Sequence, residues 1–280
     1  KVAVYSPIKV LPKLPWDDAV ILALNYAEIP YDIVYDEDVL KGKLPLYDWL
    51  HLHHEDFTGQ YGRFYSAYHT TPWYMDNEKG QEDIARKLGF SKVSQMKLAV
   101  SLKIRDFTAG GGFLFAMCSA TDSYDIALAA DGIDIVGAVN DGDGSDPNAQ
   151  KKIDFGKCFA FENFTLEMNP MVYEFSSIDV NNMSERPKMD DDYFTLFDFS
   201  AKYDPVPTML CQDHTKTIKG FMGQTTDFHE KNIKSDVTIM GEYKAYNMAR
   251  YIHGTYGNGM WTFYGGHDPE DYQHQVYDPP

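Results

Sequence analysis

One cysteine in this chain lies where an enzyme would place a nucleophile. Cys118 follows a glycine triplet and a short apolar run (residues 110–117), and helical spacing begins at Ser119. The glycines permit a sharp turn and the apolar run is too short for a helix, so we expect a strand that enters a helix at Cys118. Ala116 and Ala120 are small enough for such an elbow. Because the N–H groups and dipole of a first helical turn favour a thiolate, the pattern predicts a reactive thiol, the alternative being an inert buried cysteine.

A thiol nucleophile needs a base, and His267 is the candidate. Residues 257–266 repeat the layout of a glycine turn, a strand and further glycines, so His267 is expected to leave the end of a strand. Asp268 and Glu270 are both close enough in sequence to orient the imidazole, and Pro269 favours an extended Asp268. Either acid remains a candidate for the third member of a Cys-His-acid triad, which forms wherever the fold brings its members together. The alternative for His267 is a strand-end residue bonded to Asp268.

Further candidates follow a third expected strand at residues 49–53. Glu55 would emerge from this strand at the same edge of the sheet as the cysteine and the histidine, which makes it a candidate site residue; otherwise it is an ordinary surface acid. An oxyanion hole needs two N–H groups aimed at one point. Gly59 permits one of them, and Ser119, the residue after the cysteine, supplies the other.

A histidine cluster beside the same strand supports a metal-dependent alternative. On a strand His51 and His53 point to one face, and with His54 and either Glu55 or Asp56 they offer ligands for a divalent transition metal. A metal-bound water would then be the nucleophile. Histidines in a central strand more often pack against a covering helix, so the main hypothesis includes neither a metal nor another cofactor.

An acidic loop has the spacing of a calcium site. Asp141, Asp143 and Ser145 recur at ligand-like intervals, but Lys152 stands where an EF-hand requires glutamate. A plain turn is therefore the expectation.

A non-catalytic function is a further alternative, because the chain is rich in aromatic residues that stack on sugars or on a partner surface. The densest group comprises Tyr61, Phe64, Tyr65, Tyr68, Trp73 and Tyr74. Aromatic residues at such spacings also build cores. The alternative function is that of a carbohydrate- or partner-binding protein on the same scaffold.

Strands and helices are expected to alternate along the chain. The expected strands are 2–5, 33–35, 49–53, 113–117 and 133–139, and the expected helices are 16–27, 84–88, 93–104 and 119–130. Alternation of this kind predicts an α/β fold with an open, mainly parallel sheet and helices on both faces. Residues 237–240 are expected to be a strand or short helix, and 243–252 a helix. The whole chain, 1–280, is read as one domain with a partly β insertion at about 140–207.

Several motifs resemble one superfamily. The elbow at 110–120 followed by a late Gly-His-x-x-Glu at 266–270 is similar to the class I glutamine amidotransferase-like superfamily, and residues 256–270 resemble its trehalose-utilisation branch. With residues 1–7 and 47–56, the chain also resembles bacterial proteins labelled "asparagine synthetase B". The resemblance implies a flavodoxin-like fold, a Cys-His-Glu triad, amide hydrolysis of a small-molecule substrate, and a periplasmic or cell-envelope location, with a cytoplasmic location as the alternative. The family elbow carries glycines at the positions of Ala116 and Ala120, and its usual His-x-Glu is one residue shorter.

Composition limits the partners of the protein. The 280 residues include 25 Lys and Arg against 42 Asp and Glu, a net charge of −17, which disfavours nucleic acid and anionic membranes. No apolar run approaches the roughly 20 residues that cross a bilayer. The three cysteines, Cys118, Cys158 and Cys211, make no disulfide framework. The oligomeric state is left open.

Overall fold

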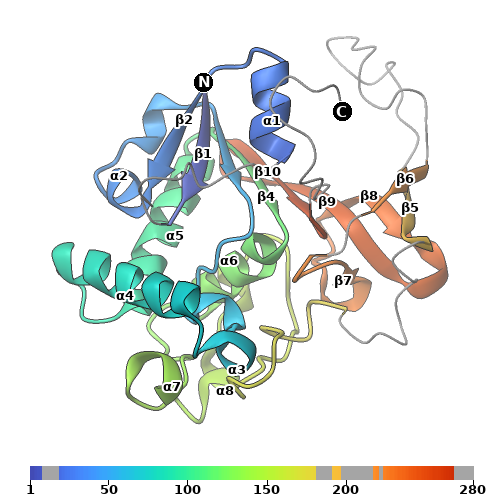
Figure 1. Ribbon diagram of the computed structural model, residues 1–280. Coiled ribbons are helices and arrows are strands. Elements are labelled where there is room, and N and C mark those ends of the chain that lie inside the picture. The colour runs from blue at the N-terminus through green and yellow to red at the C-terminus, as the bar shows by residue number, and fades with distance from the viewer. Residues whose placement is uncertain (8–18, 181–190, 197–216, 221–222, 268–280) are drawn as a thin grey trace.

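A single mixed sheet organises the protein (Figure 1). The structure is a computed structural model that describes residues 1–7, 19–180, 191–196, 217–220 and 223–267. The strand order is β2-β1-β3-β4-β10-β9-β8-β5-β6, and β7 pairs with β9. The parallel part contains β1 (Val2–Ser6), β2 (Tyr31–Tyr35), β3 (Trp49–Leu52), β4 (Phe113–Met117) and β10 (Gly259–Tyr264). The antiparallel part adds β5 (Tyr193–Leu196), β6 (Thr217–Lys219), β7 (Phe228–His229), β8 (Thr238–Tyr243) and β9 (Met248–Tyr256).

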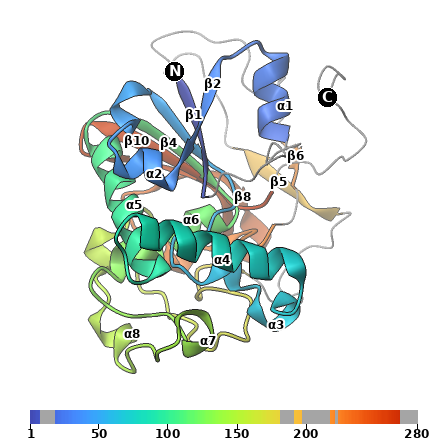
Figure 2. The ribbon, with the colours of Figure 1, turned by 60° about the vertical axis from the view of Figure 1, so that its left-hand side comes forward.

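The described helices gather mainly on one face of the parallel strands (Figure 2). They are α1 (Ala19–Tyr26), α2 (Asp36–Leu40), α3 (Tyr65–Tyr68), α4 (Pro72–Lys87), α5 (Val93–Ala109), α6 (Ser119–Ala129), α7 (Ala138–Asp141) and α8 (Ala149–Lys152). Because side chains alternate along a strand, Ala3 and Tyr5 of β1 face the main core with α5 and α6, whereas Val2 and Val4 pack against Leu24 of α1.

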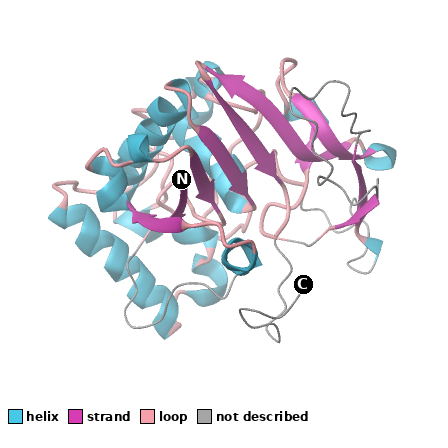
Figure 3. Ribbon diagram, turned by 90° about the horizontal axis from the view of Figure 1, so that it is seen from above, coloured by secondary structure: helices cyan, strands magenta, loops and turns pink. Residues whose placement is uncertain are grey.

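The predicted flavodoxin-like, mainly parallel sheet with helices on both faces is wrong. Five of the nine strand pairings among the described residues are antiparallel, beginning with the β9–β10 hairpin. Figure 3 shows the strands from above, with most of the helices to one side of them. Residues 243–252 were expected to form a helix, but most of them belong to β8 and β9. Met248 and Ile252 are four residues apart, a spacing that suits one face of a helix and also one face of a strand, so periodicity does not separate the two. The turn at Gly257 favours a strand over a helix, because it folds β9 back along β10.

The strand expected at residues 133–139 is also absent. Residues 133–137 have no regular structure, and α7 begins at Ala138. Asp134 closes a local turn by accepting the N–H of Val136 at 3.0 Å. Both edges of β4 are already paired, with β3 and with β10, so the segment that follows α6 finds no free edge beside the elbow strand.

The first part of the expected insertion is integrated into the core. Phe159, Phe161, Phe164 and Phe175 lie in the same buried cluster as the central strands, and an isolated bridge joins Asp179 to Phe228. The alternating run at 194–199 lies partly in β5, and its last three residues are outside the described ranges. Residues 84–87 belong to α4, a longer helix than expected, and Leu88 is its C-cap.

Candidate functional site

The structure confirms the strand-to-helix elbow at Cys118. The residue has φ 52° and ψ −139° and lies between β4 and α6. A side chain at positive φ is strained, and such strain concentrates at functional sites. The elbow is held by the Cys118 N–H, which donates to the carbonyl of Tyr264 at 3.1 Å, and by the Thr121 hydroxyl, which donates to the Cys118 carbonyl at 2.6 Å. Ala116 and Ala120 are fully buried against it, as the small-neighbour argument requires.

Backbone N–H groups surround the sulfur of Cys118. The N–H of Gln224 donates to Sγ at 3.2 Å, and those of Thr225 and Ser119 also point to it. Burial raises the pKa of the thiol to about 11, and these three donors oppose that shift because they favour the thiolate. The thiol therefore needs a base to become a nucleophile at neutral pH. Ser119 is the donor expected from the sequence, whereas residues 224 and 225 were not predicted.

The donors at 224 and 225 come from a loop, residues 223–227, that approaches the thiol closely. A methyl group added to Gly223 would lie 2.7 Å from Sγ and 3.3 Å from the backbone nitrogen of His267. Only glycine allows this approach. The side-chain amide of Gln224 donates to the carbonyls of Gly62 and Tyr173, at 2.8 and 3.2 Å, which fixes the loop from its other side.

Two buried acids also fasten this loop. The hydroxyl of Thr225 donates to Asp122 Oδ1 at 2.9 Å, and the N–H of Thr226 donates to Asp179 Oδ1 at 3.1 Å. Burial and the charge of Asp179 raise the pKa of Asp122 well above its usual range. The hydrogen bonds to these two acids orient the loop beside the thiol.

A buried ion cluster anchors the end of the same loop. Arg250 of β9 binds Asp227 through Nε at 2.7 Å and Asp192 through Nη2 at 2.9 Å. The Arg250 carbonyl accepts the N–H of Gly265 at 2.7 Å. One residue of the antiparallel part thus holds both the donor loop and the segment that leads to His267.

Cys118 and His267 line one cavity, as the sequence predicts. The cavity measures about 450 Å³ and is lined by His54, Phe64, Cys118, Ser119, Tyr173, Gly223, Gln224 and His267. The cysteine follows β4, and the two histidines follow β3 and β10, the strands on either side of it. Because these strands are parallel, their carboxyl ends meet at one edge.

Three imidazoles meet beside the thiol. The ring centroids of His53 and His54 are 4.5 Å apart, and that of His267 is 4.9 Å from the first and 5.6 Å from the second. The predicted group of His51, His53 and His54 is therefore replaced by one in which His267 takes the place of His51. His51 stacks on Phe115 instead, with centroids 5.2 Å apart.

Glu55 is buried next to the histidines. Its Oε2 accepts the N–H of His53 at 2.8 Å, and its Oε1 meets no donor among the residues that the structure describes. Burial raises the pKa of Glu55 to about 7, and nearby His53 opposes the rise. Asp56 has a different role, because its two oxygens accept the N–H groups of Thr58, Gln60 and Gly62 and so shape the following loop.

One of the predicted site residues, Gly59, lies away from the cavity. Gly59 has φ +80°, and a methyl group there would meet the backbone of Ser94 at 2.6 Å, so it packs against α5 and does not line the cavity. The N–H of Gln224, which donates to the Cys118 sulfur, is a better candidate for the oxyanion donor that was expected from Gly59. Asp268 and Glu270 lie outside the described residues, so the choice between them stays a prediction.

The aromatic group divides into core and surface members. Tyr61 and Tyr74 are buried in a core cluster. Phe64 lines the cavity, and its ring lies 5.9 Å from that of Trp73 and 5.7 Å from that of Tyr173. An aromatic wall thus runs from the thiol cavity to the exposed surface at Trp73.

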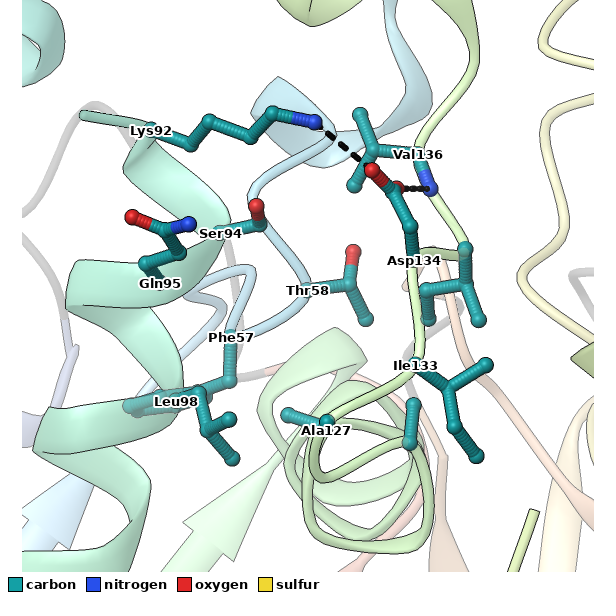
Figure 4. Close-up of a pocket in the computed structure, with 13 residues that line it drawn as sticks. Phe57, Thr58, Lys92, Ser94, Gln95, Leu98, Ala127, Ile133, Asp134 and Val136 are labelled. Carbon is teal, nitrogen blue, oxygen red and sulfur yellow. Dashed lines mark hydrogen bonds and ion pairs between the residues drawn. The ribbon is translucent and has the colours of Figure 1, made fainter. Parts of the chain in front are cut away.

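A second cavity, of about 250 Å³, lies at the other end of α6 (Figure 4). Its lining is mostly apolar, with Phe57, Leu98 and Ala127 among the residues shown. At its rim Lys92 Nζ lies 2.6 Å from Asp134 and 3.0 Å from Asp141, and it also pairs with Asp143. The acidic loop expected to be a turn therefore holds an ammonium group of its own chain.

The two cysteines in the described part of the chain, Cys118 and Cys158, are both free and buried, and Cys211 lies outside it. None of the described helices is both long enough and apolar enough to cross a bilayer.

Comparison with known proteins gives no family. No protein-family model and no curated protein matches the chain. Among solved structures, the cytoplasmic protein STM3548 from Salmonella typhimurium aligns with 12% identity and a TM-score of 0.42, over 96% of this chain and 89% of that chain. The cytoplasmic protein STM1381 from Salmonella typhimurium LT2 aligns with 11% identity and a TM-score of 0.42, over 97% and 89%. A β-galactosidase from Bacillus circulans sp. alkalophilus aligns with 12% identity and a TM-score of 0.39, over 96% of this chain and 29% of that enzyme. Scores this low carry no argument about function or location.

Proposed function

We propose that this protein is a cysteine-dependent hydrolase that acts on an amide or related acyl substrate. The observation that carries the proposal is the strained elbow at Cys118, whose sulfur lies among backbone N–H donors in a cavity that it shares with His267. A strained elbow, a ring of N–H donors and an adjacent imidazole are the parts that acyl transfer requires. The elbow and late-histidine motifs resemble class I glutamine amidotransferase-like proteins, and glutamine is accordingly the first amide to test.

The reaction begins with attack of Cys118 on the substrate carbonyl. The imidazole of His267 takes the thiol proton as the Sγ–C bond forms, which explains how a thiol with a raised pKa becomes nucleophilic at neutral pH. The tetrahedral intermediate collapses with cleavage of the C–N bond, and the imidazolium returns its proton to the leaving amine. Water then loses a proton to the imidazole and attacks the thioester, and the thiol is regenerated with the carboxylic acid as product.

The N–H groups that surround the sulfur supply the oxyanion hole. The oxygen of the tetrahedral intermediate is only two bonds from Sγ, so the donors of Ser119, Gln224 and Thr225 are the nearest to it. One such donor contributes on the order of 10²-fold to 10³-fold in rate. Phe64 and Tyr173 give the same cavity an aromatic wall, which favours an acyl substrate with a planar or apolar group.

Trapping of an acyl-enzyme tests the proposal. Purified protein is mixed with p-nitrophenyl acetate, an activated acyl donor, or with glutamine, quenched in acid, and digested for peptide mass spectrometry. The expected results are an acetyl thioester on Cys118 and a burst of nitrophenol that Cys118→Ser lacks. Turnover or acylation that is the same in Cys118→Ser and the wild type would overturn the proposal.

A further inference from the structure

We propose that His53, His54 and His267 bind one divalent transition-metal ion of the Zn²⁺ class at the wall of the Cys118 cavity. One ring nitrogen of each histidine lies within 4.8 Å of the others. Ligands of a tetrahedral Zn²⁺ ion at 2.0–2.1 Å are about 3.4 Å apart, so shifts of about 1 Å bring the three rings into coordination. Three imidazoles with an open fourth position form a recurrent zinc site.

The fold holds the three histidines in place from behind. Glu55 Oε2 accepts the N–H of His53 at 2.8 Å, and the hydroxyl of Ser119 donates to the carbonyl of His54 at 2.9 Å. The residue before His267 is fixed by its N–H, which donates to the carbonyl of Thr225 at 2.7 Å. Metal sites depend on such outer contacts, because they limit the reorganisation that binding costs.

A buried carboxyl lies beside the cluster. Glu55 accepts the N–H of His53 through Oε2, and its Oε1 has no donor among the described residues. An acceptor oxygen of this kind beside three imidazoles is compatible with a bound cation. His54 and His267 line the cavity and His53 is buried, so an ion bound to the three imidazoles would lie at the cavity wall.

A second group of potential ligands in the chain serves as a contrast. One carboxylate oxygen each of Asp134, Asp141 and Asp143 also lies within 4.8 Å of the others. The ammonium group of Lys92 already lies among them. The chain thus neutralises its acidic cluster internally. The imidazole cluster offers nitrogen ligands, which suit Zn²⁺, Ni²⁺ or Cu²⁺ better than Ca²⁺ or Mg²⁺.

Metal binding would also affect the proposed hydrolase, and this consequence alone rests on that function. An ion on the His267 ring engages the nitrogen lone pair that would accept the Cys118 proton. Occupancy of the site is therefore expected to slow cysteine chemistry, and a chelator to restore it.

Metal titration of the chelator-treated full chain tests the site directly. Zn²⁺ binding is measured by calorimetry, and Co²⁺ binding by visible absorption, in a Cys118→Ser background, so that neither the thiol nor any hydrolase activity contributes. The expected result is one ion per chain with a dissociation constant on the order of 1 μM or tighter and a tetrahedral Co²⁺ spectrum. His54→Gln and His267→Gln should each weaken binding at least about tenfold.

The matched control is His69→Gln, which removes an exposed imidazole at the end of α3 and should leave the affinity unchanged. Circular dichroism confirms that each variant is folded. The proposal is overturned if Zn²⁺ does not bind stoichiometrically, or if His69→Gln weakens binding as much as the two cluster variants. Because every readout is metal binding, failure of the hydrolase proposal leaves this result intact.

Discussion

The two ends of helix α6 lie beside cavities that are lined by different chemical groups. At its N-terminus, Cys118, His54 and His267 surround the first cavity together with backbone N–H donors. Near its C-terminus, Ala127 and Ala130 line the second, whose charged groups form ion pairs with one another. The first cavity combines a thiol, imidazoles and backbone N–H donors, and the second is lined by neither cysteine nor histidine. On the proposed function, reactivity therefore depends on which groups the strand ends deliver, and not on the presence of a cavity.

Replacement of the nucleophile should have the largest effect. We expect Cys118→Ser to lower turnover of acyl substrates by at least about 10³-fold, because a serine hydroxyl is a far poorer nucleophile without a site adapted to it. Cys158→Ser is the matched control, since Cys158 is equally buried but lies against the carbonyl of Asp125 at 3.4 Å. Equal losses in the two variants would remove the distinction between the two cysteines. Steady-state kinetics of both variants on one substrate measure the two losses.

Displacement of the donor loop should have the next largest effect. Gly223→Ala places a methyl group 2.7 Å from the Cys118 sulfur, so the loop or the thiol must shift. The N–H groups of Gln224 and Thr225 would then no longer point to the sulfur. We expect a fall of about 10²-fold in kcat with a folded protein. Gly144→Ala is the control, because a methyl group there meets no atom within 4 Å. A Gly223→Ala protein with normal kcat would separate the loop from catalysis.

A change at the other end of α6 should affect stability and not chemistry. Hydrogen bonds to three carboxylates raise the pKa of Lys92 although burial opposes them, so Lys92→Met leaves those acids to repel one another. We expect the free energy of unfolding to fall by about 1–2 kcal/mol with kcat unchanged. Urea denaturation and a rate assay on the same sample measure both. A loss of kcat without a loss of stability would mean that the second cavity takes part in the reaction.

The smallest expected effect is a pH dependence of the free energy of unfolding, which originates at Asp125 in the middle of α6. Burial raises the pKa of Asp125 to about 6 although the N–H groups of Phe159 and Ala160 lower it, and an unfolded aspartate titrates near 3.9. The folded state therefore holds a proton that the unfolded state releases, and this contribution to stability is complete below about pH 4 and is lost as the pH rises through about 6.

Asp125 should accordingly contribute about 1 kcal/mol more to stability at pH 5 than at pH 7.5. Buried Glu55, with a pKa raised to about 7, adds to the dependence in the same direction. Urea denaturation at the two pH values should therefore give a difference in stability that is about 1 kcal/mol smaller in Asp125→Asn than in the wild type. An unchanged difference would assign the dependence to other groups.

The site was more predictable from sequence than the sheet. The elbow at Cys118 and the strand before His267 were predictable because glycines, short apolar runs and small neighbours are local signals. The antiparallel half was not, because Met248 and Ile252 fit a helix face and a strand face alike. Pairing with β10, a long-range contact, determines which one forms.

The site residues that were not predicted also depend on long-range contacts, which local sequence patterns do not reveal. Gln224 and Thr225 contact the thiol although they lie 106 and 107 residues after it in the sequence. The only local signal was the run Gly-Gln-Thr-Thr-Asp at 223–227, whose small and polar residues before a strand indicate a loop. His51 was grouped with His53 by strand parity. The chain leaves β3 after Leu52, so that parity ends there and His267 joins the cluster instead.

Competitive alkylation of the two buried cysteines tests the central claim most directly. Native protein with chelator is treated with limiting iodoacetamide at pH 7, and the modification of Cys118 and Cys158 is quantified by peptide mass spectrometry in the wild type and in His267→Gln. Burial raises the pKa of both thiols, so neither is expected to react fast without a base. Because His267 is the proposed base of Cys118, we expect Cys118 to react at least about tenfold faster than Cys158 in the wild type. We expect His267→Gln to remove this difference. Equal rates in the wild type, or a Cys118 rate that does not change in His267→Gln, would contradict it.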